Sequence, residues 1–242
     1  MFNTLFSISE NVMIKNLIRK LLGNKKLETF AKKISVWRLK RYGYECLRNF
    51  DELLSHRGIH YWLMYGTLLG AVREHGFIPH DDDIDVGMFC KDINSDLVYL
   101  LSKRGFVFKR VEITSDNKYR MMTFSYHGIS FDIYGYNFDE NTDNMIIGFQ
   151  VYPLEGGDWM SSRKENLYRV CLTHQKYDGI ERCSFGKNSL AIPKNAHVLL
   201  CKLYGEDYMT PLKGKKAFKS SIIEILPIET IHAKIVPLNF LN

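Results

Sequence analysis

Acidic side chains are concentrated in one short stretch of the chain, PHDDDIDVGM, which covers residues 79–88. Side chains alternate between the two faces of a strand, so Asp81, Asp83 and Asp85 are expected to share one face. Ile84 then faces a core, and Asp82 falls on that apolar side, at the entrance of the strand rather than in the site. Carboxylates two residues apart on one face raise each other's pKa unless a cation lies between them. The spacing therefore predicts a metal site.

The type of cation follows from the ligands that this stretch offers. Carboxylate oxygens suit hard divalent ions, and magnesium typically takes one or two protein carboxylates and leaves room for water and substrate phosphates. We expect magnesium, with manganese as the alternative. A calcium loop would require the spacing D-x-[DN]-x-[DN]-G, which is absent here. Asp139, Asn141 and Asp143 also lack the required glycine, and they predict a polar hairpin tip.

A third carboxylate can be placed from a predicted hairpin. Residues 119–126 and 129–136 alternate in polarity, and His127-Gly128 between them is typical of a two-residue turn. This turn makes Tyr126 oppose Ile129, Phe124 oppose Phe131 and Met122 oppose Ile133 on an apolar face. The other face carries Thr123, Ser125, Ser130 and Asp132. Asp132 is therefore expected on the polar side of a strand that neighbours the first.

The segment before the aspartates predicts a strand, a turn and a helix. Residues 60–65 are rich in aromatic side chains and end at Gly66, which is typical of a buried strand. Thr67 is expected to cap a helix over residues 68–74, whose first backbone N–H groups would then face a ligand. Gly66 would let that ligand approach the backbone, and Gly70 would let the helix lie close to the sheet. An anion site and an ordinary strand–turn–helix both fit this pattern.

The amino-terminal part of the chain differs from the rest in charge. Between residues 13 and 48 there are eleven Lys or Arg and two Glu, and apolar residues recur at helical spacing over 14–22. We expect residues 1–43 to form a basic helical extension, with a separate helix over 44–56. The extension would either make a peripheral contact with an anionic membrane or present a solvated face.

Overall composition narrows the class of protein. The formal net charge of +6 favours anionic partners, yet no RNA- or DNA-binding motif accompanies the basic residues, so nucleic acid is not expected. No apolar run reaches the ~18 residues needed to span a bilayer. The odd number of scattered cysteines indicates free thiols in a reducing cytoplasm. These cysteines are Cys46, Cys90, Cys171, Cys183 and Cys201.

The order Gly66-Thr67, Asp83-Ile84-Asp85 and then Asp132 resembles the nucleotidyltransferase superfamily. Within it, YGTLLGAVREHGFIPHDDDIDVGM closely resembles the LicD family of phosphorylcholine transferases, which is related to fukutin and fukutin-related protein. The resemblance extends over residues 58–211, because RCSFGKNSLAIPKNAHVLLCKLYGEDYMTP is similar to the family's later segment. It implies an α+β fold over residues 44–242, with a small mixed sheet flanked by helices.

The resemblance also implies a reaction. LicD-type proteins move a substituted phosphate from a CDP-activated donor to a hydroxyl of a glycan or lipid-linked glycan, and release CMP. Asp83 and Asp85 would hold magnesium across the donor's diphosphate, and Asp132 would either complete a second metal site or accept the hydroxyl's proton. The remaining expected substrate-binding residues are Gly66, Thr67, Asp81, Tyr136 and the cations Arg73, Lys118 and Arg120. A nucleotidyltransferase that releases pyrophosphate and a binding module without turnover stay open as alternatives.

The headgroup on the donor is the last expectation. A quaternary ammonium is recognised by aromatic faces, each worth about 0.5–2 kcal/mol. Tyr134 and Tyr136 share the polar strand face with Asp132, and Tyr152 and Trp159 follow in the next segment. This pattern favours CDP-choline as donor, with core aromatics of a sheet as the alternative reading of the same residues.

Overall fold

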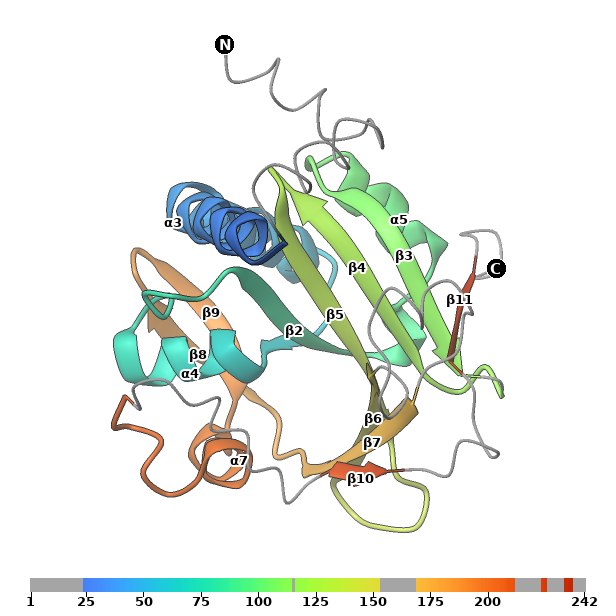
Figure 1. The fold of residues 1–242 in the computed structure, drawn as a ribbon. Coiled ribbons are helices and arrows are strands. Elements are labelled where there is room, and N and C mark those ends of the chain that lie inside the picture. The colour runs from blue at the N-terminus through green and yellow to red at the C-terminus, as the bar shows by residue number, and fades with distance from the viewer. Residues whose placement is uncertain (1–23, 115, 153–168, 212–222, 226–232, 237–242) are drawn as a thin grey trace.

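The computed structural model describes residues 24–114, 116–152, 169–211, 223–225 and 233–236 (Figure 1). The helices in these ranges are α3 (Asn24–Ser55), α4 (Tyr65–Glu74), α5 (Ser95–Ser102) and α7 (Ala196–Tyr204), with a 3-10 turn, η1, at Cys90–Asp92. The strands are β1 (Tyr61–Leu63), β2 (Asp83–Phe89), β3 (Val107–Thr114), β4 (Arg120–Tyr126), β5 (Ile129–Phe138), β6 (Met145–Tyr152), β7 (Arg169–Lys176), β8 (Ile180–Phe185), β9 (Asn188–Pro193), β10 (Ile223–Ile225) and β11 (Ala233–Val236).

Nine of these strands form one mixed sheet. Its main path runs β10-β7-β6-β5-β4-β3-β11, while β2 pairs with β5 and β1 pairs with β2. Strand β2 runs parallel to β5, and the other pairings are antiparallel. Strand β5 pairs with β2 through residues 130–136 and with β6 through residues 136–138, so β2 and β6 follow each other along one edge of β5. The expected α+β fold with a mixed sheet is confirmed.

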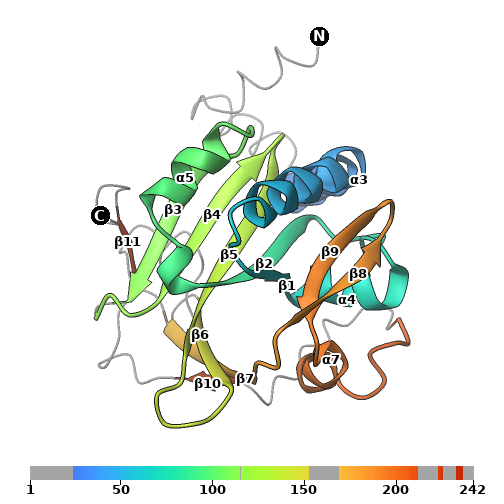
Figure 2. The same cartoon turned by 180° about the vertical axis from the view of Figure 1, so that it is seen from behind.

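Helices α3 and α5 cover one face of the sheet, as both views show (Figures 1 and 2). The ring of Phe50 on α3 lies 4.7 Å from that of Phe131 on β5 and 5.1 Å from that of Tyr61 on β1. Ile84 of β2 is fully buried in the same core. Because side chains alternate along a strand, the neighbours of Ile84 and Phe131 point to the opposite face of the sheet.

The hairpin of β4 and β5 has the predicted register. Tyr126 pairs with Ile129, Phe124 with Phe131 and Met122 with Ile133. His127 and Gly128 both have positive φ angles, 48° and 80°, as a two-residue hairpin turn of this kind requires. The polar tip between β5 and β6 is also confirmed, since Asp139 accepts hydrogen bonds from the backbone N–H of Asn141 and the hydroxyl of Thr142.

A second hairpin, β8–β9, is tied to α3. The guanidinium of Arg182 donates to both carboxylate oxygens of Asp51, at 2.6 and 2.8 Å, and the Tyr61 hydroxyl donates to the same carboxylate at 2.7 Å. The Asp51 carboxylate is only 15% exposed, while the Arg182 side chain is 45% exposed, so water reaches the pair mainly from the arginine side. The contact fixes the carboxyl-terminal half of α3 against β1 and the hairpin.

Three expectations about the elements need correction. The separate helix over 44–56 is wrong: α3 is continuous from Asn24, so the expected boundary between residues 43 and 44 falls inside a helix. The strand over 60–65 is only three residues long, and Tyr65 already belongs to α4. A Cβ on Gly70 would meet the backbone of Gly76 and Ile78, so this glycine admits a neighbouring loop rather than the sheet. The predicted apolar helical stripe over residues 14–22 lies outside the described residues.

Two further sequence expectations concern the cysteines and the membrane. The four described cysteines, Cys46, Cys90, Cys183 and Cys201, are free thiols, and Cys171 carries no described side chain. Within the described ranges, no helix combines the length and the apolar character that crossing a bilayer requires.

Candidate active site

The strongest candidate site is a cluster of carboxylates on β2 and β5. Asp85 on β2 lies opposite Asp132 on β5, and Asp83 lies opposite Ser130, in a parallel register. All of these side chains point away from the core beneath α3, because Ile84, Phe131 and Ile133 between them are fully buried on the other side. Asp85 itself is only 8% exposed. The three predicted catalytic carboxylates are thus brought together on one face of two adjacent strands.

A row of polar side chains extends from these carboxylates across the sheet. Asp132 pairs with Thr123 on β4, which in turn pairs with Arg110 on β3. The Thr123 hydroxyl donates to one oxygen of Asp132 at 2.5 Å, and the Ser130 hydroxyl lies 3.3 Å from the other. These two hydroxyls fix the orientation of the Asp132 carboxylate.

The electrostatics of the cluster oppose full ionisation. Burial raises the pKa of Asp83 to about 7, and the charges of Asp81, Asp82 and Asp132 add to this effect. Burial also raises the pKa of Asp85, followed by repulsion from Asp83 and Asp132. The pKa of Asp132 is raised by burial, although its bond with Thr123 and the charge of Arg110 act in the other direction. Because burial and mutual repulsion outweigh the nearby cations, these carboxylates are the arrangement that a bound cation stabilises.

Asp81 and Asp82 precede β2 rather than belonging to it. Oxygens of Asp81, Asp82 and Asp83 lie within 4.8 Å of one another, so Asp82 is not turned away from the cluster as the strand alternation predicted. The alternation failed because the strand begins at Asp83, and a period of two does not apply before it. Asp82 also lies 3.8 Å from Lys32 on α3. One oxygen of Asp81 is buried without a hydrogen-bond partner among the described residues.

The beginning of α4 lies beside Asp81. A Cβ on Gly66 would stand 3.0 Å from a carboxylate oxygen of Asp81, so a larger residue here would press on this carboxylate. The expected anion seat at the start of this helix therefore faces a carboxylate, and an anionic ligand at this point requires a cation to offset the repulsion. Tyr65, the first residue of α4, has a φ of 45°, a left-handed conformation that costs a non-glycine residue about 1–3 kcal/mol.

Thr67 does not cap α4, contrary to the prediction. The cap position is Met64, which makes no side-chain cap, and Thr67 lies in the first helical turn. Its hydroxyl oxygen instead accepts a hydrogen bond from the backbone N–H of Asp85 at 3.0 Å. Thr67 is buried, so this bond links α4 to the carboxylate-bearing part of β2 without competition from water.

The three predicted cations contact groups outside the carboxylate cluster. Arg120 shares the helix-covered face of β4 with Met122, and its guanidinium donates to the Ile93 carbonyl at 3.0 Å. Lys118 is exposed in the turn before β4, and Arg73 pairs with Glu74 and donates to the Tyr208 carbonyl. The alternation of β4 in the sequence already places Arg120 on the face of Met122 and Phe124. Arg120 therefore faces the side of the sheet opposite to the carboxylates, which disfavours its expected role there.

The aromatic residues beside Asp132 are packed rather than open. Tyr136 is 1% exposed, its ring lies 5.4 Å from that of Trp62, and a Cβ on Gly148 would strike it. Tyr134 lies against Tyr65, with ring centroids 4.9 Å apart. These contacts leave no open aromatic cage on this part of β5. Trp159 and the side chain of Tyr152 lie outside the described residues.

Two side chains at the site were missed from the sequence. Arg110 shares the carboxylate face of the sheet and is held by an ion pair of 2.8 Å with the buried Glu112. Its place could have been found by extending the hairpin alternation to β3. Tyr204 lies at the end of α7. Burial is the main cause that raises its pKa, and the charges of Asp85, Asp81 and Asp83 raise it further, which places this hydroxyl near the carboxylates. No local pattern indicates that the end of this helix reaches the site.

A mixed sheet that presents carboxylates on adjacent strands next to the start of a helix defines a nucleotidyltransferase-type domain. The model of the LicD/FKTN/FKRP nucleotidyltransferase domain matches residues 58–195, more than half of the chain. The chain belongs to the LicD/FKTN/FKRP family.

Individual relatives match shorter parts of the chain. An uncharacterized protein of Rickettsia prowazekii is 49% identical over 49 residues, which are 20% of this chain and 18% of that protein. The ribitol-5-phosphate transferase FKTN of Macaca fascicularis is 29% identical over 104 residues, 43% of this chain and 22% of the relative. The ribitol 5-phosphate transferase FKRP of Mus musculus is 25% identical over 138 residues, 50% of this chain and 24% of the relative. The chain thus spans about a fifth of the length of these relatives.

Proposed function

We propose that this protein is a metal-dependent phosphotransferase that moves a substituted phosphate from a CDP-activated donor to a hydroxyl of a glycan or lipid-linked glycan. The observation that carries the proposal is the carboxylate cluster on β2 and β5, in which Asp83 has a pKa of about 7. Membership of the LicD/FKTN/FKRP family supports the class of reaction.

The residues of the cluster fit a magnesium or manganese ion. All of the donor atoms are carboxylate oxygens, which hard divalent cations prefer, and the unpartnered buried oxygen of Asp81 points to a missing positive charge. Asp83 and Asp85 would hold the ion, with Asp81 or Asp132 as a further ligand. When bound, the ion would neutralise charge on the donor's diphosphate and on the departing CMP.

The protein's own groups would perform the remaining tasks. In the proposed reaction the acceptor hydroxyl attacks the phosphorus distal to cytidine, the bond from that phosphorus to the oxygen bridging to the α-phosphate breaks, and CMP leaves. Asp132, oriented by Thr123 and Ser130, is the candidate to accept the hydroxyl's proton. Arg110, on the same face and partly exposed, is the candidate cation for donor phosphate oxygens, in place of Arg73, Lys118 and Arg120.

For the headgroup we propose a polyol phosphate such as ribitol phosphate rather than phosphorylcholine. The packing of Tyr136 against Trp62 argues against the expected choline cage, and two of the relatives are named as transferases of ribitol 5-phosphate. A polyol is recognised through hydrogen bonds, for which polar side chains on the sheet face suffice.

A panel of donors tests this function. CDP-ribitol, CDP-glycerol and CDP-choline are each incubated with the protein, magnesium and candidate glycan acceptors, and CMP and pyrophosphate are quantified by chromatography. We expect CMP from a polyol donor only when an acceptor is present, and none from the Asp83→Asn variant. Pyrophosphate release from CTP would instead identify a nucleotidyltransferase. Turnover of CDP-choline but not of the polyol donors would overturn the headgroup assignment and leave the reaction class standing.

A further inference from the structure

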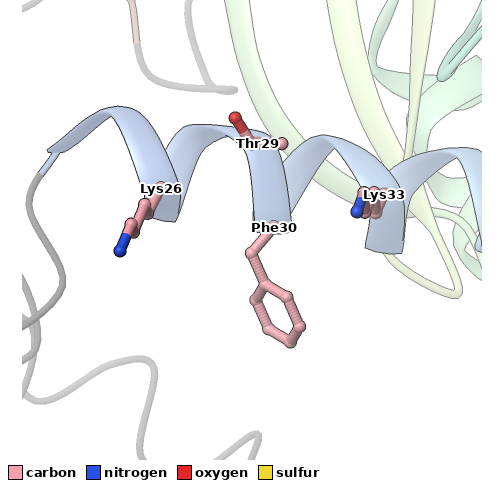
Figure 3. A pocket seen from close by; sticks show the side chains of 4 residues that line it. All are labelled: Lys26, Thr29, Phe30 and Lys33. Atoms are coloured by element: carbon pink, nitrogen blue, oxygen red, sulfur yellow. The ribbon is translucent and has the colours of Figure 1, made fainter.

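The amino-terminal half of α3 carries an exposed stripe of aromatic and basic side chains. Phe30 and Trp37, seven residues apart on one side of the helix, are 62% and 56% exposed. Exposed basic residues lie at three- and four-residue spacing around them, where neighbours share a helix face. Figure 3 shows Phe30 projecting outward from the helix, with Lys26 and Lys33 one turn before and after it. The aromatic-basic stripe consists of Lys26, Phe30, Lys33, Trp37, Lys40 and Arg41.

The stripe differs from other exposed apolar groups in the described part of the chain. Tyr99 and Val198, for example, are exposed singly on α5 and α7, which is ordinary for a protein surface. The stripe instead combines two large rings on one helix face with a strong excess of positive charge. Residues 24–44 contain seven Lys or Arg and one acidic residue. The opposite side of α3 is occupied, because Leu39, Leu47 and Phe50 are buried in the core.

The side of α3 next to the stripe faces the loop that carries the acidic cluster, and Lys33 of the stripe lines the groove between them. Lys32 on α3 lies 3.8 Å from Asp82, and a groove of about 530 Å³ separates the helix from Pro79 and His80 in the loop before β2. Thr29, Lys33 and Val36 line the helix side of this groove. A surface that docked on the stripe would therefore meet the edge of this groove at Lys33.

We propose that the aromatic-basic stripe of α3 docks on an anionic lipid bilayer. Phe and Trp on one helix face beside several Lys and Arg are the features by which an amphipathic helix lies in the membrane interface, with rings at the headgroup boundary and cations at anionic lipid phosphates. This inference concerns localisation and does not depend on the proposed reaction.

The charge of the stripe disfavours two other occupants. A second copy of the chain in a two-fold symmetric contact would place the stripe against itself, with like charges facing each other. Residues 1–23 contain three basic residues and one acidic residue, so they also offer no complementary charge. An anionic surface matches the cations, and a lipid surface in addition accommodates the exposed rings.

Vesicle binding tests the proposal. The full-length protein is sedimented with phosphatidylcholine vesicles and with vesicles that also contain phosphatidylglycerol, and a variant carries Phe30→Ser and Trp37→Ser. We expect the wild type to bind only the anionic vesicles, and this binding should weaken as salt rises from about 0.1 M to about 0.5 M. The variant should bind about tenfold more weakly than the wild type. A second variant, Lys26→Gln with Lys33→Gln, should weaken binding to a similar extent. Tyr99→Ser on α5 with Lys103→Gln at the residue that follows this helix is the matched control and should bind like the wild type.

Two accompanying measurements separate the alternatives. Because the changed side chains are exposed, all variants should keep the wild-type melting temperature, and Trp37 fluorescence should shift to the blue with anionic vesicles only. Equal vesicle binding by the wild type and the Phe30→Ser, Trp37→Ser variant would overturn the proposal and place any membrane contact elsewhere. The proposal would also be overturned if light scattering showed that the wild type is a dimer and that the Phe30→Ser, Trp37→Ser variant is a monomer that still binds vesicles like the wild type. An absence of wild-type binding to anionic vesicles would overturn it as well.

Discussion

Replacing Asp83 by Asn should stabilise the protein in the absence of divalent cations and remove the proposed activity. In the folded protein the pKa of Asp83 is raised from 3.8 to about 7, mainly by burial and then by Asp81 and Asp82. Between these two values the folded state binds more protons than the unfolded state, so the free energy of unfolding falls as the pH rises through this window. Each pKa unit corresponds to about 1.36 kcal/mol, which gives about 4 kcal/mol for the whole shift.

The gain from Asp83→Asn should be smaller than this total. Asp81, Asp82 and Asp132 share the repulsion, so protonation of a neighbour relieves part of it in the wild type, and we expect about 2 kcal/mol at about pH 8. The difference should shrink as the pH falls toward about 4, because the folded-state carboxyl is then protonated and the unfolded-state carboxyl approaches its own pKa of 3.8. Urea unfolding in EDTA at several pH values measures it, with the exposed Glu181→Gln as a control expected to change the stability by less than about 0.5 kcal/mol.

Magnesium should reverse the order of stability. A cation bound by the carboxylates stabilises the folded wild type, whereas Asp83→Asn lacks one of the proposed ligands. Only the wild type should therefore gain free energy of unfolding when magnesium is added. A variant that is no more stable than the wild type in EDTA at high pH would refute the electrostatic reasoning. A stability difference that does not depend on pH would refute it too.

Three further substitutions test other contacts. Thr67→Val keeps the shape of the side chain but leaves the buried Asp85 N–H without its acceptor, so it should lower the free energy of unfolding by about 1–3 kcal/mol; an unchanged urea midpoint would contradict this. Gly66→Ala should displace the Asp81 carboxylate and weaken manganese binding measured by electron paramagnetic resonance, with an unchanged affinity as the contrary result. Arg182→Met leaves the carboxylate of Asp51 without its bidentate partner and should cost about 1–3 kcal/mol in urea unfolding, whereas a cost below about 0.5 kcal/mol would show that the pair is only a surface contact.

The sequence predicted those parts of the site that a period of two controls. The alternation through β5 and the His127-Gly128 turn gave the register of the hairpin and the place of Asp132, and the register was confirmed. The same alternation failed at Asp82, because the residues before Asp83 are not in a strand. The same alternation along β4 puts Arg120 on the apolar face with Met122, which the expected role of Arg120 in substrate binding overlooked.

Other features depend on packing between distant segments. The residues before Tyr44 are too polar to predict a helix that packs in the core. The structure shows that they continue directly into the buried carboxyl-terminal half of α3 and form one helix with it. Thr67 has the ordinary residue type of a helix cap, but the approach of β2 turns it into an acceptor for Asp85. Tyr204 reaches the carboxylates from α7, and a single sequence contains no local signal for such a contact.

The most direct test of the proposed site is the metal dependence of donor binding. Isothermal titration of a non-hydrolysable CDP-ribitol analogue into the protein would be carried out with magnesium and with EDTA, for the wild type and Asp83→Asn. An anionic diphosphate cannot approach several carboxylates without a cation, so we expect binding by the wild type with magnesium and at least about a hundredfold weaker binding in the other three combinations. Equal affinity in EDTA, or in Asp83→Asn with magnesium, would contradict a metal site built from these carboxylates.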